Sequence, residues 1–152
     1  MSEVKVDFAD MRDLDSWMKL VRNVREIFPG LETEECLKGY ERTVEKNIKR
    51  KTALCAKDEN EVVGVLLFSK KYNMLCFMAV DPRYRCMGIA SQLIKTMFQY
   101  LDKEKDIIVT TFREDDEKGI APRNLYKKFG FVEAELVEEF GYPNQKFILH
   151  PL

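Results

Sequence analysis

Residues 80–94 read VDPRYRCMGIASQLI, and this stretch determines the architecture that we expect for the chain. A strand-like run ends at Val80, a turn with the single glycine Gly88 follows, and Ile89 and Leu93 then recur at the spacing of one helix face. The N-terminus of a helix presents free backbone N–H groups, which bind anions. The stretch therefore predicts a strand, a turn and a helix arranged around a local anion site.

Composition limits the class of protein. A chain of 152 residues with 45% hydrophobic residues is large enough for one domain, which we expect over residues 1–152. Its 25 basic and 26 acidic residues leave a net charge of -1, so no global basic field attracts nucleic acid or an anionic membrane. Apolar stretches are short and the first residues lack a secretory pattern, so we expect a cytoplasmic protein with no membrane partner.

Cysteine and histidine usage excludes several kinds of site. The four cysteines, Cys36, Cys55, Cys76 and Cys86, have no C-x-x-C spacing, which favours reduced thiols over zinc ligands or disulfides. The one histidine, His150, lies near the C-terminus, so neither a multi-histidine metal site nor a Ser-His or Cys-His nucleophile is expected. We therefore expect no metal.

Hydrophobic periodicity predicts the order β-α-α-β-β-β-α-β-α-β-β along the chain. Proline and glycine mark several of the boundaries, because proline lacks an N–H for the strand ladder and glycine commonly ends helices. The expected segments are strand 4–8, helices 10–28 and 37–51, strands 52–57, 61–69 and 73–80, helix 89–101, strand 106–112, helix 121–129, and strands 131–137 and 145–149 around a turn at 141–144.

The turn from Arg85 to Ala90 has the chemistry of a diphosphate site. Gly88 and Ala90 are small where a ligand must approach the backbone, and Arg85 shapes the loop or adds charge. No Gly-Lys-Ser/Thr follows and only one glycine of a dinucleotide fingerprint is present, so triphosphate and NAD sites are disfavoured. From these residues alone, an ordinary strand-to-helix turn remains the alternative.

Two spaced elements resemble the GNAT superfamily, the GCN5-related N-acetyltransferases. The first is Val80-Asp81-Pro82 followed by Arg85-x-x-Gly88-x-Ala90, which is similar to the family's acetyl-CoA signature. The second is Asn124-Leu125-Tyr126 leading to Gly130-Phe131. The resemblance covers nearly the whole chain. It implies an α/β (α+β) fold with a mixed, mostly antiparallel central sheet of about seven strands flanked by four helices.

The resemblance also implies a cofactor and the residues that bind it. Acetyl-CoA would be the co-substrate, with its pyrophosphate on the turn and its pantetheine arm in a gap between the strand ending at Val80 and the strand at 107–112. Cys86 and Met87 are uncharged where relatives often carry glycine or a basic residue. The implied cofactor-binding residues are Met78 and Val80 through their backbone, then Arg85, Cys86, Met87, Gly88, Ile89, Ala90 and Ser91 of the turn and helix start, and Asn124.

The implied reaction is direct attack of a primary amine, of a small molecule or a peptide, on acetyl-CoA. Tyr126 matches the family tyrosine that protonates the departing thiolate, and a phenol with a pKa of about 10 suits that task. The alternative is a core ring with its hydroxyl at the surface. Glu26, Glu32, Glu34 and Glu35, around the connection between the first two helices, suggest a cationic acceptor, although such runs usually form a solvated face.

Several alternatives stay open. A non-catalytic module of the same fold would bind coenzyme A for regulation, and a nucleotide-binding protein without coenzyme A is disfavoured by the missing Lys-Ser/Thr. Trp17 either lines the acceptor pocket or faces the core, and a reactive Cys86 is not expected. A homodimer that pairs through the turn at 141–144 and the last strand competes with a monomer.

Overall fold

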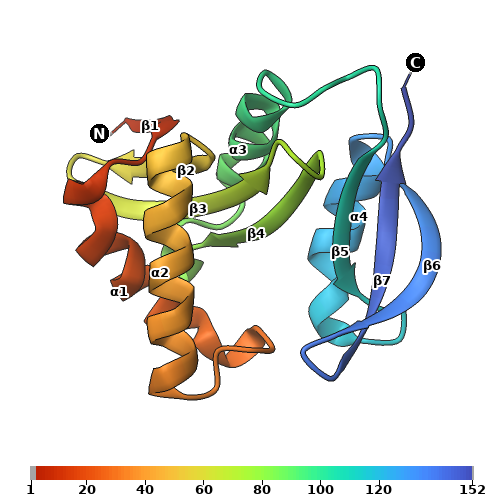
Figure 1. The fold of residues 1–152 in the computed structure, drawn as a ribbon, viewed down its shortest axis with the longest axis horizontal. Helices are drawn as coiled ribbons and strands as arrows, with labels where there is room; N and C mark the ends of the chain where they lie inside the picture. Colours follow the sequence, from red (N-terminus) through yellow and green to blue (C-terminus); the bar gives the residue numbers. More distant parts are fainter. Residues whose placement is uncertain (1–2, 152) are drawn as a thin grey trace.

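All seven strands and four α-helices expected from the sequence occur in the structure, a computed structural model that describes residues 3–151 (Figure 1). No helix in this part of the chain is long and apolar enough to cross a membrane. The elements in chain order are β1 (Val4–Phe8), η1 (Met11–Asp13), α1 (Leu14–Val24), η2 (Arg25–Ile27), α2 (Glu34–Arg50), β2 (Ala53–Asp58), β3 (Glu61–Ser69), β4 (Met74–Val80), η3 (Pro82–Tyr84), α3 (Ile89–Phe98), β5 (Ile107–Phe112), η4 (Glu117–Gly119), α4 (Ile120–Lys128), β6 (Val132–Glu139) and β7 (Tyr142–Leu149).

The strands form one open sheet in the order β1-β2-β3-β4-β5-β7-β6. Every neighbouring pair is antiparallel except β4 and β5, which are parallel because α3 connects them across the sheet. The expected mixed, mostly antiparallel α+β fold is therefore confirmed. The single parallel pair lies at its centre, directly beside the strand-turn-helix stretch.

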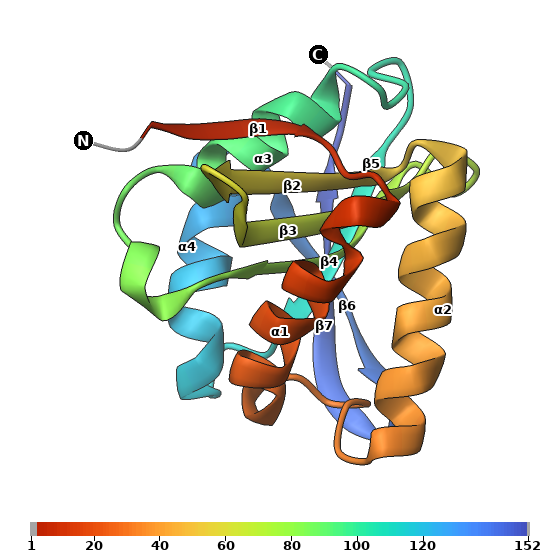
Figure 2. The same ribbon diagram turned by 90° about the vertical axis from the view of Figure 1, so that its left-hand side faces the viewer.

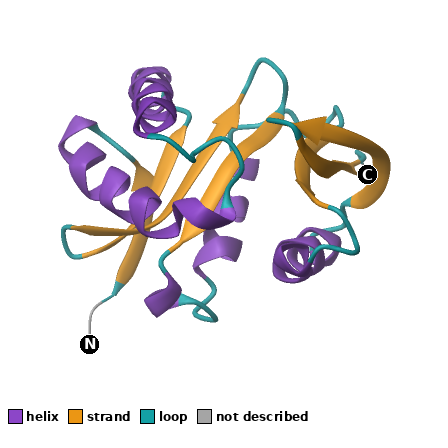
Figure 3. Ribbon diagram, turned by 90° about the horizontal axis from the view of Figure 1, so that it is seen from below, coloured by secondary structure: helices purple, strands orange, loops and turns teal. Residues whose placement is uncertain are grey.

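Alternating side chains divide the core into two apolar clusters, one on each face of the sheet. In β2, Ala53 and Cys55 belong to the cluster under α1 and α2, whereas Leu54 and Ala56 belong to the cluster under α3 and α4. Figure 2 shows α1 in front of the strands and α3 behind them, and Figure 3 shows helices on both sides of the sheet. Both faces are thus covered, which explains the nearly continuous apolar runs of β2 and β3.

Trp17 belongs to the core and not to a pocket. Its side chain is fully buried in α1, and its indole N–H donates to the Tyr40 hydroxyl of α2 at 3.0 Å. Tyr40 in turn packs against Phe77 of β4, with 5.0 Å between ring centroids. The pair therefore joins both helices to the sheet and satisfies the only buried indole donor in the described residues.

The boundaries differ from the sequence-based expectation most clearly at two places. The predicted helix 10–28 is divided into η1, α1 and η2. The expected turn at 141–144 is wrong, because the loop contains only Phe140 and Gly141, whose φ angles of 53° and 74° suit a two-residue hairpin. Strand β7 therefore starts at Tyr142, and Pro143 lies beyond the last residue that pairs with β5, where its missing N–H breaks no bond on that side.

This topology also changes the expected route to a dimer. Strand β7 lies between β5 and β6, so both of its edges are already paired. Pairing of two copies through an edge of β7 would therefore require β5 or β6 to move away, and the free edges of the sheet in the described residues are β1 and β6. A homodimer as such stays a prediction.

Candidate functional site

Strands β4 and β5 separate soon after they meet. Met74 pairs with Ile108 and Leu75 with Val109, and these are the only residue pairs between the two strands in the described chain. Strand β5 continues beside β7, while β4 continues beside β3, so the two halves of the sheet diverge (Figure 1). The predicted gap between these strands is present.

The backbone of β4 is unpaired on the side of this gap. The N–H of Asp81 donates to the carbonyl of Val63 at 2.8 Å, which identifies that pair as hydrogen-bonded. Because bonding alternates along an antiparallel strand, the N–H and C=O groups of Met78 and Val80 point away from β3 and toward the gap. The structure thus places both predicted residues where an extended ligand can add to the strand edge.

The turn after β4 is held rigidly by the β2–β3 hairpin. The buried carboxylate of Asp81 accepts from the Arg83 backbone N–H at 2.9 Å and from its guanidinium at 2.8 Å, and the same guanidinium pairs with Glu61. These bonds from Arg83 hold the pKa of Asp81 below its usual value. One residue on, the Tyr84 hydroxyl donates to Asp58 at 2.6 Å. The sequence reasoning missed all four contacts, and the partners Glu61 and Asp58 are distant from the turn in the chain.

Free backbone donors gather where this turn enters α3. Gly88, the N-cap, is left-handed with φ 78°, and no side chain caps the helix. The first intrahelical bond runs from the Gln92 N–H to the Gly88 carbonyl at 3.0 Å, so the N–H groups of residues 89–91 have no backbone partner. Arg85 and Cys86 are both exposed beside them, and Cys86 is also left-handed with φ 62°. Free backbone donors in this arrangement suit an anion.

Gly88 is required by its conformation, because a residue with a side chain is strained at this φ. A Cβ at this position would meet no atom within 4 Å, so the space above the turn is open. Ile89, the next residue, is buried against the sheet. The turn is thus open to solvent on one side and anchored on the other.

Tyr126 lies in α4 within the same apolar cluster as Met78 and Val80. Its ring is 5% exposed and packs against Phe131 and Phe147, with centroid distances of 5.8 Å and 6.2 Å. Burial raises the pKa of its hydroxyl, which therefore keeps its proton at neutral pH. That hydroxyl has no hydrogen-bond partner among residues 3–151, yet it is not fully buried. The core ring of the alternative is therefore present, and the catalytic role of the hydroxyl stays a prediction.

Asn124 is exposed on the same helix. Arg123, which precedes it, is the buried residue. Its guanidinium donates to the Phe112 carbonyl and to Gln145, and it lies over the Phe147 ring at 4.8 Å. Sequence reasoning did not identify Arg123, whose role is to join α4 to β5 and β7.

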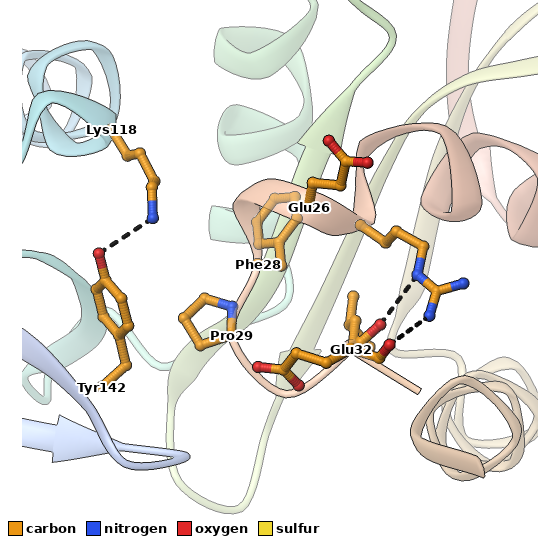
Figure 4. A pocket seen from close by; sticks show the side chains of 8 residues that line it. Glu26, Phe28, Pro29, Glu32, Lys118 and Tyr142 are labelled. Atoms are coloured by element: carbon orange, nitrogen blue, oxygen red, sulfur yellow. Dashed lines mark hydrogen bonds between the residues drawn. The ribbon is translucent and has the colours of Figure 1, made fainter. Parts of the chain in front are cut away.

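A cavity of about 540 Å³ lies between the two halves of the sheet (Figure 4). One wall is the connection between α1 and α2, and the other is formed by η4 and the start of β7. Phe28 of the first wall packs on Phe77 of β4 with 4.7 Å between ring centroids, so the cavity adjoins the segment of β4 that has left β5. Its lining residues are Arg25, Glu26, Phe28, Pro29, Leu31, Glu32, Lys118 and Tyr142.

The structure separates the four glutamates that the sequence grouped. Glu26 and Glu32 line the cavity, and Glu32 accepts from the Gly30 N–H at 3.0 Å, which lowers its pKa. Glu34 instead pairs with Arg22 at 2.8 Å, and Glu35 is exposed but not among the lining residues. Only two of the four can therefore contact a molecule in the cavity.

Within residues 3–151, no group of three or more histidine, cysteine, aspartate or glutamate side chains is placed to hold a metal ion. The free thiol groups of Cys36, Cys76 and Cys86 are exposed, and that of Cys55 is buried.

Comparisons with known proteins agree with this geometry. A family model described as the acetyltransferase (GNAT) family matches residues 17–131. A GNAT-family acetyltransferase from Bacillus cereus ATCC 10987 is similar in structure, with a TM-score of 0.76, 21% identity and 99% of each chain covered. No curated protein matches the sequence.

Two further structures of this fold contain a cofactor. The PaiA N-acetyltransferase from Thermoplasma acidophilum, in complex with coenzyme A, has a TM-score of 0.68 at 15% identity over 95% of this chain and 98% of that one. The putative acetyltransferase YncA from Salmonella typhimurium, with its cofactor acetyl-CoA, has a TM-score of 0.72 at 12% identity over 95% and 91%. At these identities the likeness is one of fold.

Proposed function

The chain belongs to the GNAT acetyltransferase family, and from this premise we propose that it transfers an acetyl group from acetyl-CoA to the nitrogen of a primary amine. One observation carries the proposal. The unpaired edge of β4 and the uncapped N-terminus of α3 lie at the two ends of a single turn, so donors for an extended amide chain adjoin donors for a diphosphate. The structures of PaiA and YncA, which share the fold, were solved with coenzyme A and acetyl-CoA respectively.

The residues present fit coenzyme A. The N–H groups at the start of α3 suit a diphosphate, and Arg85 is exposed beside them to add positive charge. The backbone of Met78 and Val80 suits the amides of a pantetheine arm, which would continue the sheet as an added strand. Asn124 is a weaker contact, because it is exposed and nothing directs it to the gap.

When bound, acetyl-CoA supplies a thioester: the amine nitrogen forms a bond to its carbonyl carbon, the carbon–sulfur bond breaks, and the amine loses the proton that the thiolate gains. The free N–H groups along β4 stabilise negative charge on the carbonyl oxygen. Tyr126, which is protonated before the transfer, donates its proton to the leaving sulfur and regains one that the amine has lost, through solvent. No acyl-enzyme is required.

The acceptor amine binds in the cavity between the α1–α2 connection and β7. This follows from the contact of Phe28 with Phe77, which brings the cavity next to the unpaired part of β4. A carboxylate of Glu26 or Glu32, directly or through water, removes the proton of an incoming ammonium ion.

Isothermal titration calorimetry with acetyl-CoA tests the cofactor, with ATP as the control ligand. We expect saturable one-site binding that Gly88→Glu abolishes, because a carboxylate would then stand in the anion site. Gly141→Glu is the matched control, since Gly141 has a similar φ of 74° and an equally open Cβ position at the β6–β7 hairpin. Equal binding by both variants would contradict the cofactor site.

Release of free thiol from acetyl-CoA in the presence of an amine panel tests the enzyme. We expect Tyr126→Phe to lower kcat by about 10²-fold or more, as for loss of a positioned acid, with acetyl-CoA affinity unchanged. Tight acetyl-CoA binding with no thiol release for any amine would favour the non-catalytic coenzyme A module instead.

A further inference from the structure

The acceptor cavity has two carboxylates on one wall and a lysine on the other. Glu26 and Glu32 lie on the α1–α2 side, and Lys118 lies on the opposite side beside Tyr142 (Figure 4). The fourth ionic group of the lining, Arg25, is already engaged: its guanidinium donates to the carbonyls of Leu31 and Glu32 at 3.1 Å and 2.8 Å. Lys118 is therefore the cation of this cavity that remains available to a ligand.

Lys118 is held in place without a carboxylate partner. Its Nζ donates to the Tyr142 hydroxyl at 3.1 Å and lies over the rings of Tyr142 and Phe112, at 4.8 Å and 5.6 Å from their centroids. Asp116 is near, but it accepts the Tyr142 hydroxyl proton at 2.6 Å. In the described part of the chain, no carboxylate oxygen lies within 4.0 Å of the ammonium group. The contacts to Tyr142 also raise the pKa of Lys118, which keeps it charged.

The exposed ammonium group of Lys118 forms no direct ion pair, because Asp116 acts on it only at longer range, and its free donors can therefore bind an anion. Three donors belong to a lysine ammonium, and one of them is used by Tyr142. On the facing wall, the Gly30 N–H fixes the Glu32 carboxylate, and Glu26 has no ion pair among residues 3–151. The cavity thus offers an anion site on one side and a cation site on the other.

We propose that the acceptor is an amine that also carries an anionic group, a carboxylate or a phosphate, and that Lys118 binds this group while Glu26 and Glu32 receive the amine as its ammonium form. The inference rests on the proposed acetyl transfer, because it describes the acceptor of that reaction. The chemical class of the acceptor is inferred from the charged side chains of the cavity. It defines a substrate class narrower than primary amines in general, because an alkylamine without an anionic group offers Lys118 no ion pair.

Three matched series of amines test this class: alkylamines of increasing length, ω-amino carboxylates and aminoalkyl phosphonates of the same lengths. The measurements are kcat/KM for thiol release, and calorimetric affinity with the protein alone and saturated with coenzyme A. We expect wild type to prefer one anionic series over the alkylamines by about 10- to 100-fold, the size of one charge-assisted hydrogen bond. Comparison of the two anionic series identifies carboxylate or phosphate.

Variants at Lys118 separate recognition from structure. Lys118→Met should remove the preference by lowering kcat/KM for the anionic amines only, while Lys118→Arg should restore most of it. Lys19→Met, at an exposed lysine of α1, is the control and should keep the preference. Urea unfolding of each variant verifies that the protein remains folded.

Each failure has a distinct meaning. Equal affinity for amines with and without an anionic group would overturn the inference, and so would a preference that survives Lys118→Met. An equal loss of kcat/KM for all amines in Lys118→Met would also overturn it, because it would indicate a structural lysine. Lysine-dependent binding of an anionic amine without any thiol release would support the acceptor class and contradict the proposed enzyme. Absence of coenzyme A binding would contradict the proposed cofactor site. It would leave the acceptor class testable, because the amines are also titrated into the protein alone.

Discussion

Replacing Gly64 with alanine should loosen α3 from the sheet. Gly64 is buried in β3, and α3 packs directly on it. A Cβ at this position would lie 2.8 Å from Cγ2 of Ile89, and 3.3 Å from both Cδ1 of Leu93 and Cβ of Ala56. Because Ile89 is the first residue of α3, the same contact sets the position of the proposed anion site.

The expected cost follows from these distances. Carbon atoms in favourable contact are about 3.5–4.0 Å apart, so the Ile89 methyl would have to retreat by about 1 Å. The χ1 angle of isoleucine in a helix is strongly restricted, so the side chain cannot rotate away and the helix itself would have to shift. Overpacking lowers the free energy of unfolding by about 1–3 kcal/mol. Alanine also reduces the conformational entropy of the unfolded chain, which offsets about 0.4–1 kcal/mol of this loss. The net loss is about 1–2 kcal/mol, or about 2–8 °C in Tm for a chain of this size.

Gly39→Ala makes the same chemical change with the opposite expected sign. Gly39 lies inside α2, its φ is not positive, and the nearest atom to its Cβ would be Nη2 of Arg42 at 3.8 Å. Alanine in an open helix position stabilises by about 0.5–1 kcal/mol relative to glycine. The two variants therefore separate steric contact from the general effect of the substitution.

Equilibrium urea unfolding, followed by the fluorescence of the one tryptophan, measures both changes. Calorimetry with acetyl-CoA should show a several-fold weaker affinity for Gly64→Ala. The control Gly39→Ala should bind acetyl-CoA with the affinity of wild type. In an Ile89→Ala background, Gly64→Ala should cost markedly less, because the colliding methyl is gone. Stability of Gly64→Ala equal to wild type, or the same loss in both backgrounds, would refute the packing argument.

Three further outcomes are expected. Asp81→Asn should lower stability by about 1 kcal/mol at neutral pH. Because the folded pKa of Asp81 is depressed, this difference is fully present above the unfolded pKa of about 3.9 and is lost as the pH falls through the folded pKa. Urea unfolding at several pH values measures it. Tyr40→Phe leaves the buried Trp17 N–H without an acceptor and should cost about 1–3 kcal/mol without changing acetyl-CoA affinity. Gly30→Ala would place a Cβ 2.9 Å from the Phe140 ring at a φ of 91°, and should raise KM for the acceptor while acetyl-CoA affinity, measured by calorimetry, stays constant.

The parts of the site that could be predicted from the sequence are contiguous in it. One glycine, small neighbours and a helical period identify the turn at residues 85–90, whereas Tyr126 was identified by the resemblance of the short element around it to the GNAT family. Hydrogen bonding within each segment determines such local structure, so reading adjacent residues is sufficient. The strand boundaries failed mainly at the 140–141 hairpin, where positive φ angles in a non-glycine residue, Phe140, carry no composition signal.

The acceptor side required the folded chain. Lys118 and Tyr142 face Glu26 and Glu32 only because β4 and β5 part after two residue pairs and β7 inserts between β5 and β6. Likewise, Trp17 lies in the core because α1 packs against α2. Such pairings depend on the summed burial of two sheet faces, a property of the whole domain that is absent from any one segment. Local sequence thus specified the anion site, and long-range packing specified the charges that face the acceptor.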